Sequence, residues 1–165
     1  MGPGGEIRIL DFDVGYEGTL TERVAHMHRK GYPLLKNLLP HDAVQTKTSG
    51  KNFHTELKES GLENIKIIPR TADAWIGINQ TKQLFPRFVF RLPACERALE
   101  LLETYRVKTN TSGAWTTDDI VHDESSHVAD SLRYVAEAIS AGLIAGGGGL
   151  IPRDEPKRAH RAILA

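Results

Sequence analysis

The residue of this chain best placed to do chemistry is Asp130, a carboxylate inside an apolar helical pattern. It belongs to the segment His122–Tyr134, which reads HDESSHVADSLRY. The apolar residues of this segment and of the next turn recur at helical spacing: Val128, Ala129, Leu132, Val135 and Ala136. A carboxylate in such surroundings costs free energy unless it is paired, and a divalent metal ion is a common partner. Arg133 follows by three residues, so an Asp–Arg ion pair on a solvated face is the alternative.

A second acid, Asp42, follows the strand-like run 34–39 and Pro40. Ligands of open α/β sheets gather at the carboxyl ends of the strands, which favours a functional acid at this place. Asp after Pro is also common in turns and caps, so a purely structural role remains open. If both acids act together, an oxygen site of this kind suits Mg²⁺ better than zinc.

The seven histidines raise the alternative of a zinc hydrolase. His122 and His127 lie five residues apart, and neither a Cys cluster nor an HExxH pattern accompanies them, so the ligand spacing disfavours zinc. Lys51 ends the run TSGK, which lacks the glycine at position 45 and the Ser or Thr after Lys of a phosphate-binding loop. An ordinary loop that enters a helix is the favoured interpretation, although a helix N-terminus there could hold a DNA phosphate.

Composition sets the limits within which these residues act. The 165 residues correspond to one domain by size, and 21 basic residues balance 21 acidic residues. A basic field over the whole chain is therefore absent, and contact with nucleic acid would need a local patch. The single Cys95 forms no internal disulfide, which favours a reducing compartment. No stretch approaches the roughly 18 consecutive apolar residues of a membrane span, and the first five residues lack the features of a signal peptide.

The elements that must position the two acids alternate between strands and helices. Strands are expected at 6–13, 32–39, 65–68 and 87–90, and helices at 21–30, 48–60, 71–84, 93–105 and 125–141. Residues 107–119 are expected to form a polar loop. This alternation predicts an α/β domain, over residues 1–141, with parallel strand pairs and right-handed crossovers. Residues 142–165 are Gly-rich and then basic, and we expect them to form a flexible tail.

Six short motifs, in a fixed order, carry a resemblance to a known family. They are LPHDA (39–43), TSGK (48–51), IPR (68–70), WIGI (75–78), LFPR (84–87) and the segment His122–Tyr134. From about Glu6 to Ala138 the chain resembles the C-terminal nuclease domain of phage terminase large subunits. The ending HDxSSHxADxxRY is the most specific of the six motifs.

The resemblance implies an RNase H-like nuclease fold, with a mixed sheet flanked by helices. It also implies an endonuclease that cuts concatemeric viral DNA during genome packaging, with acids that bind a pair of Mg²⁺ or Mn²⁺ ions. Asp42 matches the family's acid at the end of a central strand, and Asp130 matches the acid on the C-terminal helix. These two are the expected catalytic and metal-binding residues. The groups expected beside the metal ligands or in contact with DNA are His41, Asp123, His127 and Lys51.

The expected partners are double-stranded DNA and other terminase or portal components, with no membrane. The expected location is the cytoplasm of a bacterial host cell, with the gene carried by a phage or prophage. The chain departs from the family in two respects. It has no ATPase motif, and 6–13 resembles the third strand, so the first two strands and the first metal-binding acid have no counterpart. Neither Asp11 nor Asp13 matches that acid.

The missing strands would expose a sheet edge and favour self-association, and the missing acid would weaken or abolish cleavage. The alternative function is therefore a non-catalytic remnant of the same fold that binds DNA or a packaging component. Its signature would be salt-sensitive DNA binding without cutting. The basic residues of the tail would support such binding: Arg153, Lys157, Arg158 and Arg161.

Overall fold

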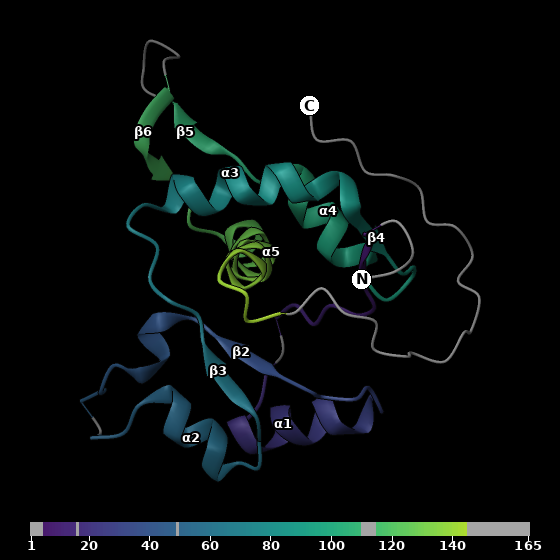
Figure 1. Cartoon of the computed structure of the whole chain (residues 1–165), viewed down its shortest axis with the longest axis vertical. Coiled ribbons are helices and arrows are strands. Elements are labelled where there is room, and N and C mark those ends of the chain that lie inside the picture. The colour runs from purple at the N-terminus through teal and green to yellow at the C-terminus, as the bar shows by residue number, and fades with distance from the viewer. Residues whose placement is uncertain (1–4, 16, 49, 110–114, 145–165) are drawn as a thin grey trace. The chain divides into compact units, whose positions relative to one another are not determined.

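The computed structural model describes residues 5–15, 17–48, 50–109 and 115–144 (Figure 1). These residues divide into two compact units, which are treated one at a time. Unit 1 takes its described residues from Met1–Gly15 and Thr81–Arg133, and unit 2 takes its own from Tyr16–Gln80 and Tyr134–Ala145. Each unit is therefore built from segments that lie far apart in the sequence.

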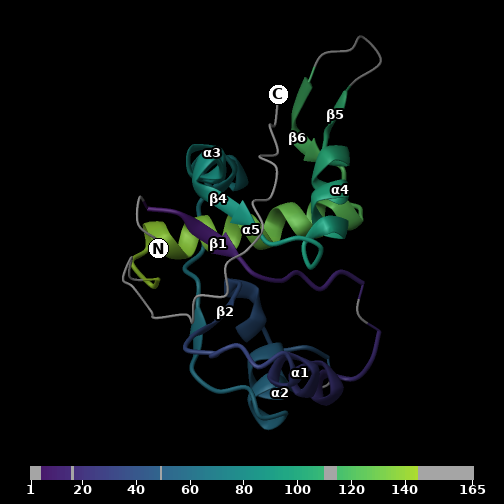
Figure 2. The same cartoon turned by 90° about the vertical axis from the view of Figure 1, so that its right-hand side faces the viewer.

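Unit 2 contains a parallel strand pair with two helices. The strands β2 (Asn37–Leu39) and β3 (Ile65–Ile67) pair in register from the first residue of each to the last. The helices α1 (Leu20–Arg29) and α2 (Phe53–Glu59) lie side by side next to this pair (Figures 1 and 2). The chain runs from β2 through a short 3₁₀ helix, η1 (His41–Val44), and through α2 into β3. This is the strand–helix–strand order that the sequence predicts.

The core of unit 2 joins these elements. Val24 of α1, Leu57 of α2 and Leu62 are almost fully buried and form one cluster. Partly buried apolar side chains from both helices, both strands and the segment before β2 pack against it: Leu20, Met27, Leu34, Leu39, Phe53 and Ile65. Burial of this apolar surface is what holds two short strands and two short helices together.

The start of α1 shows why a local motif decides a helix boundary. Thr19 accepts a hydrogen bond from the backbone N–H of Glu22 at 3.3 Å, and the Glu22 carboxylate accepts one from the backbone N–H of Thr19 at 2.8 Å. This reciprocal capping box requires Glu or Gln three residues after the cap, which Thr19 has and Thr21 lacks. The cap was expected at Thr21, two residues later than the observed cap at Thr19. Gly31, at φ 72°, ends the helix as expected.

Unit 1 contains a second parallel pair, a hairpin and most of the longest helix. Its strands and helices include β1 (Ile7–Ile9), η2 (Phe85–Arg87), β4 (Phe88–Phe90), α4 (Glu96–Thr104), β5 (Val107–Thr109), β6 (Trp115–Ile120) and the first ten residues of α5 (Glu124–Ser140). β1 pairs in parallel with β4, and β5 pairs antiparallel with β6. Around β4, three aromatic rings pack together: Phe85 lies 5.8 Å from Phe88 and 6.2 Å from Phe90, measured between centroids.

The polar loop expected at 107–119 was wrong, because β5 and β6 lie within it. Figure 1 shows this ribbon following the end of α4. Threonine, tryptophan and isoleucine favour strands, and this preference was available in the run WTTDDI. The abundance of Thr and Asp hid it, since polar residues on both faces remove the alternation that identifies a half-buried strand.

Two expected strands were too long. β1 ends at Ile9, and the Asp11 carboxylate then accepts a hydrogen bond from the backbone N–H of Phe12 at 2.8 Å, a local contact in place of the ladder. β2 begins only at Asn37, because Pro33 and the Leu35 side chain, 71% exposed, fall outside the pairing. The helix α3 (Ala74–Leu84) also begins later than Thr71, since Asp73 accepts from the backbone N–H of Trp75 at 2.9 Å.

The fold is α/β with short parallel strand pairs, as the sequence predicts. In the described part of the chain each sheet has two strands, in the pairs β1–β4, β2–β3 and β5–β6. Among the described residues, no helix has the length and apolar character needed to cross a membrane. Nearly all residues of the expected flexible tail, 142–165, lie outside the described ranges.

Candidate functional site

Asp42 lies where the sequence places it, just beyond the carboxyl end of β2. It occupies the first turn of η1, three residues after Leu39, and its side chain is exposed. Its backbone carbonyl accepts from the N–H of Gln45 at 2.9 Å, which fixes the turn. Within the described ranges its carboxylate has no hydrogen-bond or ion-pair partner. Asp42 is therefore an open acid, in unit 2, at the end of a parallel strand where ligands are commonly bound.

Asp130 has a partner in its own helix. The Arg133 guanidinium donates from Nε at 3.1 Å and from Nη2 at 3.0 Å, and both hydrogen bonds end on the Asp130 Oδ1 atom. The Asp130 side chain is 36% exposed and the Arg133 side chain 15%. This is the ion pair that the three-residue spacing allowed as the alternative to metal binding. Asp130 is consequently a neutralised carboxylate of unit 1.

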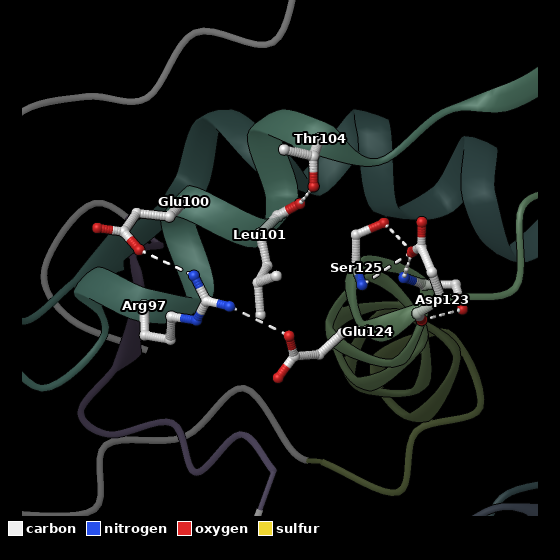
Figure 3. A network of polar contacts seen from close by, with 8 residues as sticks. Arg97, Glu100, Leu101, Thr104, Asp123, Glu124 and Ser125 are labelled. Carbon is white, nitrogen blue, oxygen red and sulfur yellow. Dashed lines mark hydrogen bonds and ion pairs between the residues drawn. The ribbon is translucent and has the colours of Figure 1, made fainter.

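Asp123 caps the N-terminus of α5. Its Oδ1 atom accepts from the backbone N–H of Ser125 at 2.9 Å and of Ser126 at 3.3 Å, and also from the Ser125 hydroxyl (Figure 3). Arg106 lies 3.5 Å from the second carboxylate oxygen. These contacts, led by the Ser125 hydroxyl, lower the pKa of Asp123 below its ordinary value of 3.8. The contacts of Asp123 are thus those of a helix cap.

A second ion-pair network lies near this cap. Figure 3 shows Arg97 of α4 between two carboxylates: Glu100 of its own helix, at 3.2 Å, and Glu124 of α5, at 3.1 Å. The three side chains are about half exposed or more, so the network contributes little to stability. It does connect the first turn of α4 with the first turn of α5.

The Asp123 cap predicts how acid affects unit 1. The pKa of Asp123 is lowered in the folded chain, so its contribution to stability is present above the ordinary value of 3.8 and is lost as the pH falls through the folded value. Asp123→Asn retains a capping side chain that does not titrate. We therefore expect it to lose less stability than the wild type between about pH 4 and pH 2, in urea unfolding followed by circular dichroism.

Glu103→Gln is the matched control for this experiment, since Glu103 is an exposed carboxylate of the same unit without a hydrogen-bond partner in the described part. It should retain the acid sensitivity of the wild type. Equal losses in the wild type and in Asp123→Asn would show that the cap does not act through the charge of Asp123.

The three other expected contact residues are dispersed. His41 is partly buried at the start of η1, and His127 is exposed on α5. Lys51 donates to the Glu59 carboxylate at 2.7 Å, and this hydrogen bond raises its pKa. Lys51 is therefore paired with α2 of its own unit.

The expected site residues are divided between the two units. Asp42, His41 and Lys51 belong to unit 2, whereas Asp123, His127 and Asp130 belong to unit 1. Among the residues described in either unit, no three His, Cys, Asp or Glu side chains form a group that could hold a metal ion. The carboxylates are of the type that Mg²⁺ prefers, but this donor set does not fit a complete two-metal centre. No hydrolytic step follows from it.

The sequence analysis did not identify one buried carboxylate, that of Glu137. Glu137, 5% exposed, accepts a hydrogen bond from the Thr71 hydroxyl at 2.8 Å, and both residues belong to unit 2. Its signal was its position seven residues after Asp130, which puts the two acids on the same side of one helix. Thr71 gave no signal, because it was assigned to the first turn of the following helix.

Comparison with known proteins identifies no relative of this chain. No protein-family model matches the chain, and no match is found among curated proteins or among solved structures.

Proposed function

We propose that this chain is the nuclease domain of a phage terminase large subunit. In this proposal it has the RNase H-like fold and cuts concatemeric double-stranded viral DNA during genome packaging, in a bacterial host. Mg²⁺ or Mn²⁺ is its cofactor, and other terminase or portal components are its partners. The ordered series of six sequence motifs, from LPHDA to HDESSHVADSLRY, supports it.

The observation that carries the proposal is the position of Asp42. It lies directly after the carboxyl end of β2, which pairs in parallel with β3, and its carboxylate is exposed and open. A structural turn residue would be expected to use its side chain to cap the turn, as Asp123 does at α5. Since Asp42 does not do so within the described residues, its carboxylate is available for a cation or a water molecule.

A specific observation favours the second candidate, a non-catalytic remnant that binds DNA or a packaging component. Arg133 already neutralises Asp130, which is the other acid that the resemblance assigns to metal. A chain that uses this acid for an ion pair would keep the fold without the chemistry. Its DNA binding would weaken steeply with salt, because it would rest on contacts with phosphates.

Cleavage of supercoiled plasmid in the presence of Mn²⁺ tests the proposal. We expect the wild type to nick and linearise the plasmid, and we expect Asp42→Asn and Asp130→Asn each to slow cleavage at least about tenfold, because each loses a metal-binding charge. Asparagine preserves the size of the side chain. Glu103→Gln removes an exposed carboxylate elsewhere and should cleave at the wild-type rate.

Equal cleavage by the wild type and both Asn variants would contradict the proposed acids, and it would indicate a contaminating nuclease. Plasmid binding that weakens with salt, with no cleavage by the wild type in Mn²⁺ or Mg²⁺, would support the non-catalytic candidate instead.

A further inference from the structure

The ion pair between Asp130 and Arg133 is asymmetric. Two guanidinium hydrogen bonds, at 3.1 Å and 3.0 Å, end on Oδ1 of the carboxylate. The carboxylate side of the pair is 36% exposed, whereas the guanidinium side is only 15% exposed. The carboxylate is therefore the more exposed partner, and the Arg133 side chain is largely screened from water by protein.

Tyr105 is partly buried. It follows α4 in the same unit, and burial is the main reason why its pKa is raised; the Asp130 charge adds to the effect and the Arg133 charge opposes it. Because the Arg133 side chain is largely buried, water screens this pair less than it screens an exposed ion pair on a helix.

This arrangement opposes the binding of a divalent cation. A cation on the Asp130 carboxylate would lie beside a guanidinium that does not lose its proton and that water reaches poorly. Repulsion between like charges grows as the surrounding water is removed, so a largely buried guanidinium opposes a nearby cation more than an exposed one would. Arg133 also restricts the rotation of the Asp130 side chain. Because this side chain is short, the conformational entropy that a bound metal ion would no longer have to remove is small. The repulsion is the larger effect.

We infer that Arg133 occupies the place of a cation at Asp130 and suppresses the binding of divalent metal there. The inference rests on the proposed function, in which Asp130 is the metal-binding acid of the last helix. Arg133 is then the residue that sets the metal affinity of this acid, and a divalent ion binds to Asp130 well only when the ion pair is opened or removed.

Titration of the full chain with Mn²⁺ tests this, by calorimetry or by the electron paramagnetic resonance of free Mn²⁺. We expect Arg133→Gln to bind Mn²⁺ on the order of tenfold more tightly than the wild type. The double variant Arg133→Gln, Asp130→Asn should lose the gain. Arg8→Gln is the matched control: it removes an Arg that pairs with Glu6 at 3.4 Å in the same unit, frees one carboxylate and should leave the affinity unchanged.

The outcomes separate the inference from the proposed function. If Mn²⁺ binding by the wild type is lost in Asp130→Asn but is not improved by Arg133→Gln, the suppression is wrong and the metal role of Asp130 stands. If no Mn²⁺ binding depends on Asp130 in either background, both are overturned. Circular dichroism establishes that each variant is folded. Arg133→Met, which retains the aliphatic stem that packs in the protein, replaces the Gln variant if that variant does not fold.

Discussion

Replacement of Leu62 by alanine is expected to lower the free energy of unfolding by about 2–5 kcal/mol. Leu62 is 3% exposed and packs in one cluster with Val24 and Leu57. The substitution removes buried methyl groups and leaves a cavity that surrounding helices and strands fill only in part. Urea unfolding of the purified chain, followed by circular dichroism, measures the loss. This cluster supports the elements on either side of Asp42, so the same variant tests the scaffold of that acid.

Leu35→Ala is the control for this experiment. It is the same substitution in the same unit, but the Leu35 side chain is 71% exposed. We expect its free energy of unfolding to stay within about 0.5 kcal/mol of the wild type. Similar losses in the two variants would show that Leu62 is not a core residue of unit 2.

The second large effect is expected at the buried Glu137. Thr71→Val preserves the shape of the side chain but removes the hydroxyl that donates to the Glu137 carboxylate at 2.8 Å. A hydrogen bond to a charged group contributes more to stability than a neutral one. We expect a loss of about 1.5–3 kcal/mol in the free energy of unfolding.

Thr71→Ser separates the hydroxyl from the methyl group. It retains the donor, and we expect a smaller loss than for Thr71→Val. A larger loss in the Ser variant would mean that Thr71 acts by packing, and that other contacts of Glu137 are sufficient to satisfy its carboxylate.

Local patterns in the sequence predicted much of the fold. The helices α1, α4 and α5 and the strand β3 lie close to their expected positions, because each has a strong apolar period or a clear stop signal. The parallel pairing also followed from the alternation of strands and helices. The ribbon β5–β6 was missed, since its polar residues carry no period. The lengths of β1 and β2 were wrong because the partner strand sets them, and the partner is not visible locally.

Some contacts of the candidate site residues could also be predicted from the sequence, and others could not. Spacing alone allowed the pair between Asp130 and Arg133, because a three-residue separation places two side chains together on a helix. The partner of Asp123 across the chain, Arg106, and the contact between Thr71 and Glu137 join residues whose proximity depends on the tertiary fold. No local pattern contains that information. Whether an acid is open, as Asp42 is, or already neutralised is likewise decided by its neighbours in space.

The pairing of β1 with β4 has a consequence for the synthesis of this chain. Residues 7–9 leave the ribosome well before their partners, residues 88–90, because the whole of unit 2's first segment lies between them. β2 and β3 are close in sequence and pair much sooner. Ile7 and Ile9 therefore wait without a partner strand while translation continues. During that interval β1 has an open edge and apolar side chains. Chaperones can bind it, and so can other nascent chains that are being translated from the same mRNA.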